Sequence, residues 1–85
     1  MKLLHDYIGD QYKQVIYFGL KLIVPVDAEY LAADSNGDLY AFTARPNFDD
    51  EGNEKYWIHG PSIKSWHIAD VDLGNISAEA TLKEI

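Results

Sequence analysis

The apolar pattern of the first 25 residues changes from a helical to a strand-like period. Residues 2–12 predict a short amphipathic helix, because apolar side chains recur there at helical spacings, at Leu3, Leu4, Tyr7, Ile8 and Tyr12. The next stretch, QVIYFGLKLIVP, is rich in β-branched and aromatic residues, which favour strands. Gly19 divides it into two predicted strands, residues 14–18 and 20–24. Pro25 ends the second, since proline has no N–H to donate to a ladder.

Residues 29–46, EYLAADSNGDLYAFTARP, have the pattern of a β-hairpin. Asn36-Gly37 favours a type I′ turn, which needs positive φ at both central residues. Counting outward from that turn pairs Ser35 with Asp38. Because side chains alternate along a strand, one face is expected to carry Leu31, Ala33, Tyr40 and Phe42, and the other Tyr30, Ala32, Leu39 and Ala41. Both faces are apolar, so we expect a helix to cover one and more sheet, or a second subunit, to cover the other.

The rest of the chain predicts two more strands and a final helix. NFDDEGNE, residues 47–54, has no periodicity and is interpreted as a polar connection. KYWIHG and IKSWHIADVD are predicted strands joined around Gly60-Pro61. Ser77 is a suitable N-cap for a short helix over AEATLKEI.

These elements together predict an α+β fold that is mainly β. We expect a small antiparallel sheet of hairpins, with about five or six strands and a short helix at each end of the chain. A chain of 85 residues is expected to form one domain, residues 1–85. Within it, residues 1–13 are predicted to be helical, residues 14–72 to form the antiparallel β core, and residues 73–85 to end in the short C-terminal helix.

Composition removes several classes of function. The chain has no cysteine, which excludes disulfides, thiolate nucleophiles and cysteine-based zinc sites. The N-terminal segment becomes polar too early for a signal peptide, and no apolar run reaches the roughly 20 residues of a membrane span. We therefore expect a cytoplasmic protein without membrane association.

The net charge of −7 is concentrated in the middle of the chain. Residues 27–54 contain eight acidic residues and a single basic one, Arg45, while acidic and basic residues cancel elsewhere. Nucleic-acid binding requires clustered lysine and arginine to neutralise phosphates, so direct binding to nucleic acid is not expected. A basic protein partner remains compatible with this charge distribution.

The polar residues do not match a known metal or catalytic motif. Asp34, Asn36 and Asp38 have the first spacings of a calcium loop, but the positions that need glycine and glutamate hold Leu39 and Arg45. A zinc site of His67 with Asp70 is not expected, because residues three apart on a regular strand face opposite sides. We predict no metal and no cofactor.

Catalysis is not predicted either. The serine and histidine residues lack a strained nucleophile turn such as Gly-x-Ser-x-Gly. Asp49, Asp50 and Glu51 lie in a polar loop where burial cannot raise a carboxyl pKa. A small hydrolase is the less favoured alternative, and it would require a dry, closed site that holds His59 or His67 with a carboxylate.

The run LKLIVPVDAEYLAADSNGDLYAFTARP, followed by YWIHG, resembles small uncharacterised proteins encoded by tailed bacteriophages and prophages. Their shared core is a strand ending in Val-Pro, an A-x-D-x-x-G-x-x-Y-A-F hairpin, a basic residue before proline, and a later tryptophan. The matching positions here are Val24, Pro25, Ala32, Asp34, Gly37, Tyr40, Ala41, Phe42, Arg45, Pro46 and Trp57. The resemblance implies an accessory protein that acts on host machinery in the bacterial cytoplasm, and it supplies no catalytic residues.

Two functional hypotheses follow. The first is a non-enzymatic protein-binding module, compatible with a homodimer, whose candidate aromatic anchors are Tyr30, Tyr40, Phe48, Trp57 and Trp66. Its acidic residues, Asp49, Asp50, Glu51 and Glu54, would steer a basic partner. The alternative is an acidic DNA mimic that occupies the nucleic-acid site of a host protein, which requires carboxylates spaced along an extended face.

Overall fold

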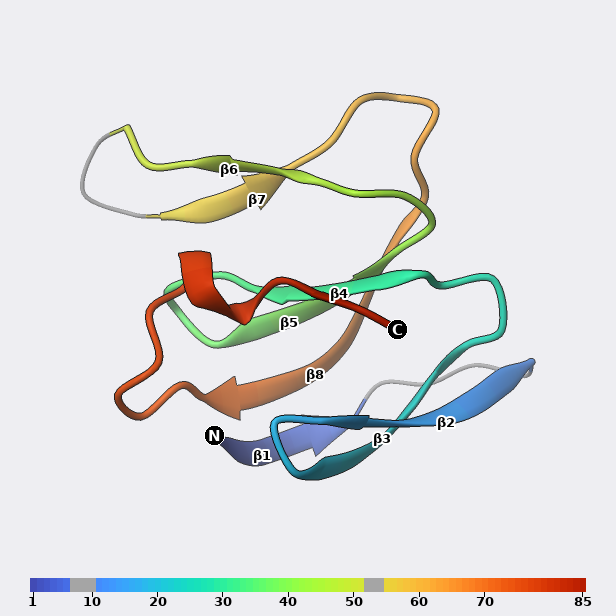
Figure 1. Ribbon diagram of the computed structural model, residues 1–85, viewed down its shortest axis with the longest axis horizontal. Coiled ribbons are helices and arrows are strands. Elements are labelled where there is room, and N and C mark those ends of the chain that lie inside the picture. The colour runs from blue at the N-terminus through green and yellow to red at the C-terminus, as the bar shows by residue number, and fades with distance from the viewer. Residues whose placement is uncertain (7–10, 52–54) are drawn as a thin grey trace.

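The computed structural model describes residues 1–6, 11–51 and 55–85, which form three antiparallel sheets (Figure 1). The largest sheet has the order β1 (Lys2–Asp6), β8 (Ser65–Asp72), β5 (Asp38–Phe42), β4 (Tyr30–Ala33) and β9 (Lys83–Glu84). The two smaller sheets are hairpins, β2 (Tyr12–Tyr17) with β3 (Leu20–Pro25), and β6 (Asn47–Asp49) with β7 (Tyr56–Ile58). The predicted mainly β, antiparallel architecture is therefore confirmed.

The predicted N-terminal helix is wrong, because Lys2–Asp6 forms strand β1 at the edge of the main sheet. Leu3 pairs with Val71 of β8 and packs against the core, whereas the next residue, Leu4, is 59% exposed. This alternation has the period of a strand. The unpaired edge of β8 offers backbone partners that an isolated short helix would lack. Tyr7 and Ile8, which also supported the helix prediction, lie outside the described residues.

The predicted C-terminal helix is also wrong. The segment makes only one 3-10 turn, η1 (Glu79–Thr81), before β9 pairs with β4. Thr81 is fully buried and its hydroxyl oxygen accepts the backbone N–H of Ala33 at 2.8 Å. The hydroxyl of Tyr17 donates to the Thr81 carbonyl oxygen at 2.5 Å. These bonds to β2 and β4 replace the bonds that a continuing helix would make. Ser77, the expected N-cap, accepts the Ala80 N–H at 3.3 Å within this turn.

The β2–β3 hairpin confirms the two predicted strands on either side of Gly19. Its two-residue turn consists of Phe18 and Gly19, with φ of 48° and 78°, and Tyr17 pairs with Leu20 across it. Positive φ at both central residues is the requirement of a type I′ turn. The sequence therefore contains the expected turn geometry, but at a different hairpin.

The β4–β5 hairpin has a longer turn than predicted. Its only positive φ is at Gly37, 93°, and the Gly37 N–H donates to the Asp34 carbonyl oxygen at 2.9 Å. The Asp34 N–H donates in turn to the Asp38 carbonyl oxygen at 2.9 Å. This is the three-residue loop in which a type I turn is followed by a left-handed glycine. Ala33 consequently pairs with Leu39, and the predicted register is wrong by one residue.

This register decides which side chains share a face. Leu31 and Ala33 lie opposite Ala41 and Leu39, and all four belong to the buried core with Leu22 of β3. The opposite face of the two strands carries Tyr30, Ala32, Tyr40 and Phe42. The core face is covered by the β2–β3 hairpin through Tyr17, Leu22 and Val24, so the predicted covering helix is wrong. Among the described residues, no helix is long and apolar enough to cross a membrane.

The β6–β7 hairpin lies on the opposite side of the main sheet from β2–β3 in Figure 1. Asn47–Asp49, part of the predicted polar connection, instead forms strand β6, so that prediction is wrong for these residues. The two predicted strands joined around Gly60-Pro61, β7 and β8, belong to different sheets. Trp57 of β7 instead attaches this hairpin to β4. Its indole Nε1–H donates to the Ala33 carbonyl oxygen at 3.0 Å, and its backbone N–H donates to Asp34 Oδ1 at 2.8 Å.

Candidate functional site

A cleft of about 500 Å³ lies between β4, the β6–β7 hairpin and the C-terminal segment. Its aromatic lining comes from Tyr30 on β4, Phe48 on β6 and Trp57 on β7. Its charged lining is provided by Arg45, Glu79 and Glu84. Residues far apart in the sequence thus form one concave surface.

The aromatic side chains of the cleft are held by specific contacts. Phe48 and Trp57 pair directly across the two strands, with ring centroids 4.9 Å apart and planes at 56°. Trp57 is anchored by its two bonds to β4. The Tyr30 hydroxyl donates a long hydrogen bond to Glu84 Oε2 at 3.4 Å. All three rings are half-buried, so part of each remains available to a partner.

The predicted acidic residues lie beside this cleft. Asp49, Asp50 and Glu51 line a shallow hollow of about 320 Å³ together with Phe48 and Ile58. Phe48 lines both hollows. We call the first hollow, with Tyr30, Phe48 and Trp57, the aromatic cleft, and the carboxylates of Asp49, Asp50 and Glu51 its acidic rim. The Glu51 N–H donates to Asp49 Oδ1 at 3.1 Å, which fixes the local turn. Glu54, the fourth predicted acidic residue, lies outside the described residues.

The other two predicted aromatic anchors lie elsewhere. Trp66 pairs with Ala41 and therefore points to the core face of the main sheet, where it packs against the core cluster. Tyr40 lies on the opposite face and stacks on the ring of His67, with centroids 5.1 Å apart and planes at 28°. Burial raises the pKa of Tyr40, and the nearby carboxylates of Asp38, Asp34 and Asp70 raise it further.

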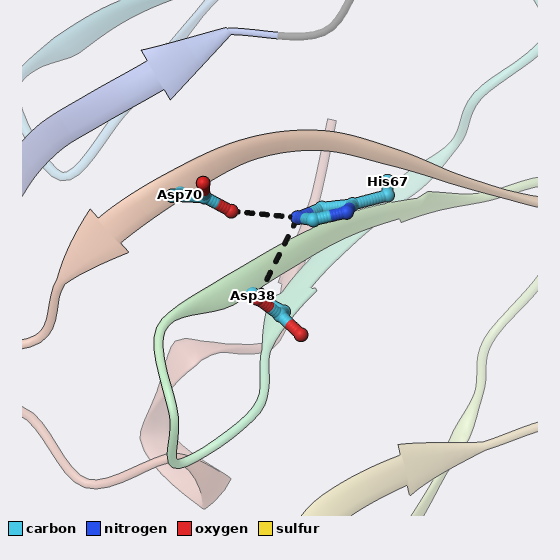
Figure 2. A group of neighbouring side chains, drawn as sticks. All are labelled: Asp38, His67 and Asp70. Carbon is cyan, nitrogen blue, oxygen red and sulfur yellow. Dashed lines mark hydrogen bonds and ion pairs between the residues drawn. The ribbon is translucent and has the colours of Figure 1, made fainter.

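A second cluster of polar side chains, Asp38, His67 and Asp70, lies on β5 and β8 (Figure 2). His67 Nε2 lies 2.8 Å from Asp70 Oδ1 and 3.6 Å from Asp38 Oδ1. The expectation that His67 and Asp70 face opposite sides is wrong because β8 contains a bulge. Tyr40 pairs with His67 and Leu39 with Ala69, so Ile68 is an extra residue that turns into the core. No local sequence signal marks this bulge, because it depends on the register against β5.

Asp34 belongs to the same electrostatic environment. Burial raises the pKa of its carboxyl group, the hydrogen bond from the Trp57 N–H lowers it, and the charge of Asp38 raises it. Asn36 donates through Nδ2 to Asp38 Oδ2 at 3.1 Å and accepts the Asp38 N–H at 3.0 Å. The residues that resemble the start of a calcium loop are thus engaged in ordinary turn and strand contacts.

His59 and Ser65 form the one serine–histidine contact among the described residues. His59 Nε2 lies 3.0 Å from Ser65 Oγ, and His59 Nδ1 lies 2.8 Å from the Gly60 carbonyl oxygen. A carbonyl oxygen only accepts, so Nδ1 carries a hydrogen and Nε2 of the neutral ring faces the serine hydroxyl. Both side chains are exposed, and this contact therefore lacks the dry, closed surroundings that a hydrolase site would require.

Comparison with known proteins adds no relative. A scan against protein-family models finds no matching family, and searches of curated proteins and of solved structures find no similar protein.

Proposed function

We propose that this chain is a non-enzymatic protein-binding module whose contact surface is the aromatic cleft with its acidic rim. The observation that supports this most is the convergence of Tyr30, Phe48 and Trp57 on one cleft from three separate strands. Aromatic residues in partly enclosed positions are the side chains that contribute most to protein interfaces. Their strand positions also limit the entropy lost when a partner binds.

The charges around the cleft support a basic partner. Asp49, Asp50 and Glu51 line the adjoining hollow, and Glu79 and Glu84 line the cleft itself. Among the residues that the structure describes, Arg45 is the only basic one that lines either hollow. The occupant we propose is an extended segment of another protein, with an apolar or proline side chain in the cleft and lysine or arginine beside it. Opposite charges accelerate the encounter more than they tighten the complex.

DNA mimicry is the less favoured alternative because several carboxylates are engaged within the fold. Asp34 accepts the Trp57 N–H, and both Asp38 and Asp70 lie against His67. Carboxylates held in this way are not arranged to imitate successive phosphates. The resemblance to phage proteins further suggests that the module acts on a host or phage protein in the bacterial cytoplasm.

Selection from a library of random displayed peptides tests the proposal. The native chain is expected to enrich peptides that combine an apolar or proline residue with flanking lysine or arginine. Phe48→Ala is expected to weaken binding of a selected peptide by about 30-fold, the loss at a strong interface anchor. Tyr12→Ala is the matched control, since Tyr12 is 58% exposed on β2 and lines no part of the cleft.

The charge contribution is measured separately by binding kinetics. Neutralising Asp49, Asp50 and Glu51 with the corresponding amides should slow association and reduce its dependence on salt. Selected peptides without basic residues, or an association rate that these changes leave intact, would refute steering. Equal losses for Phe48→Ala and Tyr12→Ala would refute the cleft as the contact surface.

A further inference from the structure

We propose that Asp38, His67 and Asp70 bind one divalent first-row transition-metal ion at a site separate from the aromatic cleft. One donor atom from each side chain lies within 4.8 Å of the other two. His67 Nε2 is 2.8 Å from Asp70 Oδ1 and 3.6 Å from Asp38 Oδ1. Ligands held about 2.1 Å from one ion lie about 3 to 3.5 Å apart, so small side-chain rotations bring these atoms into a coordination sphere.

The backbone positions these donors before any ion binds. The bulge at Ile68 places His67 and Asp70 on the same face of β8, and strand pairing places Asp38 directly opposite Asp70. The stacked ring of Tyr40 orients the imidazole. Figure 2 shows that both carboxyl groups approach the same ring nitrogen of His67. Bulges of this kind frequently re-aim a side chain next to a functional site.

The charges at the cluster favour a bound cation. Asp38 and Asp70 are a cross-strand pair of like charges, an arrangement that destabilises a sheet unless a cation lies between them. Among the described residues, neither Asp34 nor Asp38 has a lysine or arginine nitrogen within 4.0 Å. A divalent ion bound between Asp38 and Asp70 would offset the repulsion between them.

The donor set selects the class of ion. Imidazole with two carboxylates suits zinc, cobalt, nickel or manganese, whereas calcium and magnesium prefer oxygen donors alone. The side chains are 36%, 34% and 32% exposed for His67, Asp38 and Asp70, so water can complete the coordination. Three protein ligands with an open position is the pattern of an accessible metal site.

Titration of the metal-free full chain with zinc chloride, followed by calorimetry, tests this proposal, and cobalt absorption reports the coordination geometry. One ion per chain is expected to bind. His67→Gln and Asp70→Asn should each weaken binding at least about tenfold, the loss that follows even from removing an outer-sphere partner. His59→Gln is the matched control, since His59 is exposed and its ring nitrogens lie against the Gly60 carbonyl oxygen and Ser65 Oγ. It should bind zinc as the native chain does.

Asp38→Asn separates metal binding from folding. The substitution removes one member of the like-charge pair, so the metal-free variant should melt no lower than the native chain, while the rise in melting temperature caused by zinc should shrink. Absence of zinc binding by the native chain would overturn the proposal. Equal effects of His67→Gln and His59→Gln would overturn it as well. Phe48→Ala should bind zinc normally, which makes this outcome independent of the cleft.

Discussion

Thr81→Val should strongly destabilise this protein, although it only replaces a hydroxyl group by a methyl group. Thr81 and Ala33 are both fully buried, and the Thr81 hydroxyl is the acceptor for the Ala33 N–H. Valine has nearly the same shape but no acceptor, so the Ala33 N–H loses its partner, at a cost of about 1 to 3 kcal/mol. The hydroxyl oxygen also lies 2.6 Å from the Ala78 carbonyl oxygen, which is too close for the methyl group that would replace it. We therefore expect a loss of about 2 to 3 kcal/mol.

This loss converts into a measurable change in melting temperature. An unfolding entropy of about 2.1 cal/mol/K per residue gives about 0.18 kcal/mol/K for 85 residues, so the variant should melt about 11 to 17 °C lower. Urea unfolding followed by tryptophan fluorescence should show the same free-energy loss with an unchanged slope. Thr81→Ser keeps the acceptor and loses one methyl group, which costs about 1 kcal/mol. A Thr81→Val variant within 0.5 kcal/mol of the native chain (about 3 °C), or more stable than Thr81→Ser, would refute this account of the C-terminal segment.

Three further predictions concern the glycine turns, the buried Tyr17, and Asp34, whose carboxylate accepts the Trp57 N–H. Gly37→Ala should lower the free energy of unfolding by at least about 2 kcal/mol, because φ is 93° and an added Cβ would lie 2.3 Å from the Val71 carbonyl oxygen. Gly74→Ala is the comparison: φ is 61° and the space around it is open, so the loss should be about 1 kcal/mol. Equal losses in urea unfolding would contradict the close approach. Tyr17→Phe should cost about 1 to 2 kcal/mol by leaving the buried Thr81 carbonyl oxygen without the hydroxyl, and calorimetry that finds no loss would remove this bond from the account. Burial raises the pKa of Asp34 above 3.8, so the folded state loses stability as pH rises through the interval between 3.8 and the raised value. Asp34→Asn should therefore be at least as stable as the native chain at neutral pH, with the difference vanishing in acid. An equal gain from Asp50→Asn, which is exposed, would assign the effect to net charge instead.

The strand content could be predicted because it rests on local chemistry. The β-branched and aromatic run around Gly19 has no competing local structure, and both strands form where the pattern places them. Gly37 was recognisable as the centre of a chain reversal for the same reason. Phe48 and Trp57 were recognisable as candidate anchors from their type, although nothing in the sequence indicated that they pair.

The errors at the two ends of the chain have one physical origin, which is hydrogen bonding to distant parts of the chain. The N-terminal segment becomes a strand because β8 has an edge that accepts it, and the C-terminal segment leaves the helix because Thr81 bonds to β4 and Tyr17 to Thr81. The register at Asn36-Gly37 differs by one residue because a three-residue loop puts Leu39 and Ala41, rather than Tyr40 and Phe42, against the core. The core face therefore carries Leu39 and Ala41, and the rings of Tyr40 and Phe42 lie on the opposite face.

The sequence by itself determined a cysteine-free, acidic, mainly β chain with hairpins at two glycines, because these properties depend on residue type and on neighbours within a few positions. Only the tertiary structure decided that Tyr30, Phe48 and Trp57 share a cleft and that Asp38, His67 and Asp70 meet. Both arrangements depend on strand pairing and on one bulge, and the free energy of pairing comes from partners that lie tens of residues away. The local sequence pattern does not identify such partners, because the register of the strands is set by how distant segments pack in the core.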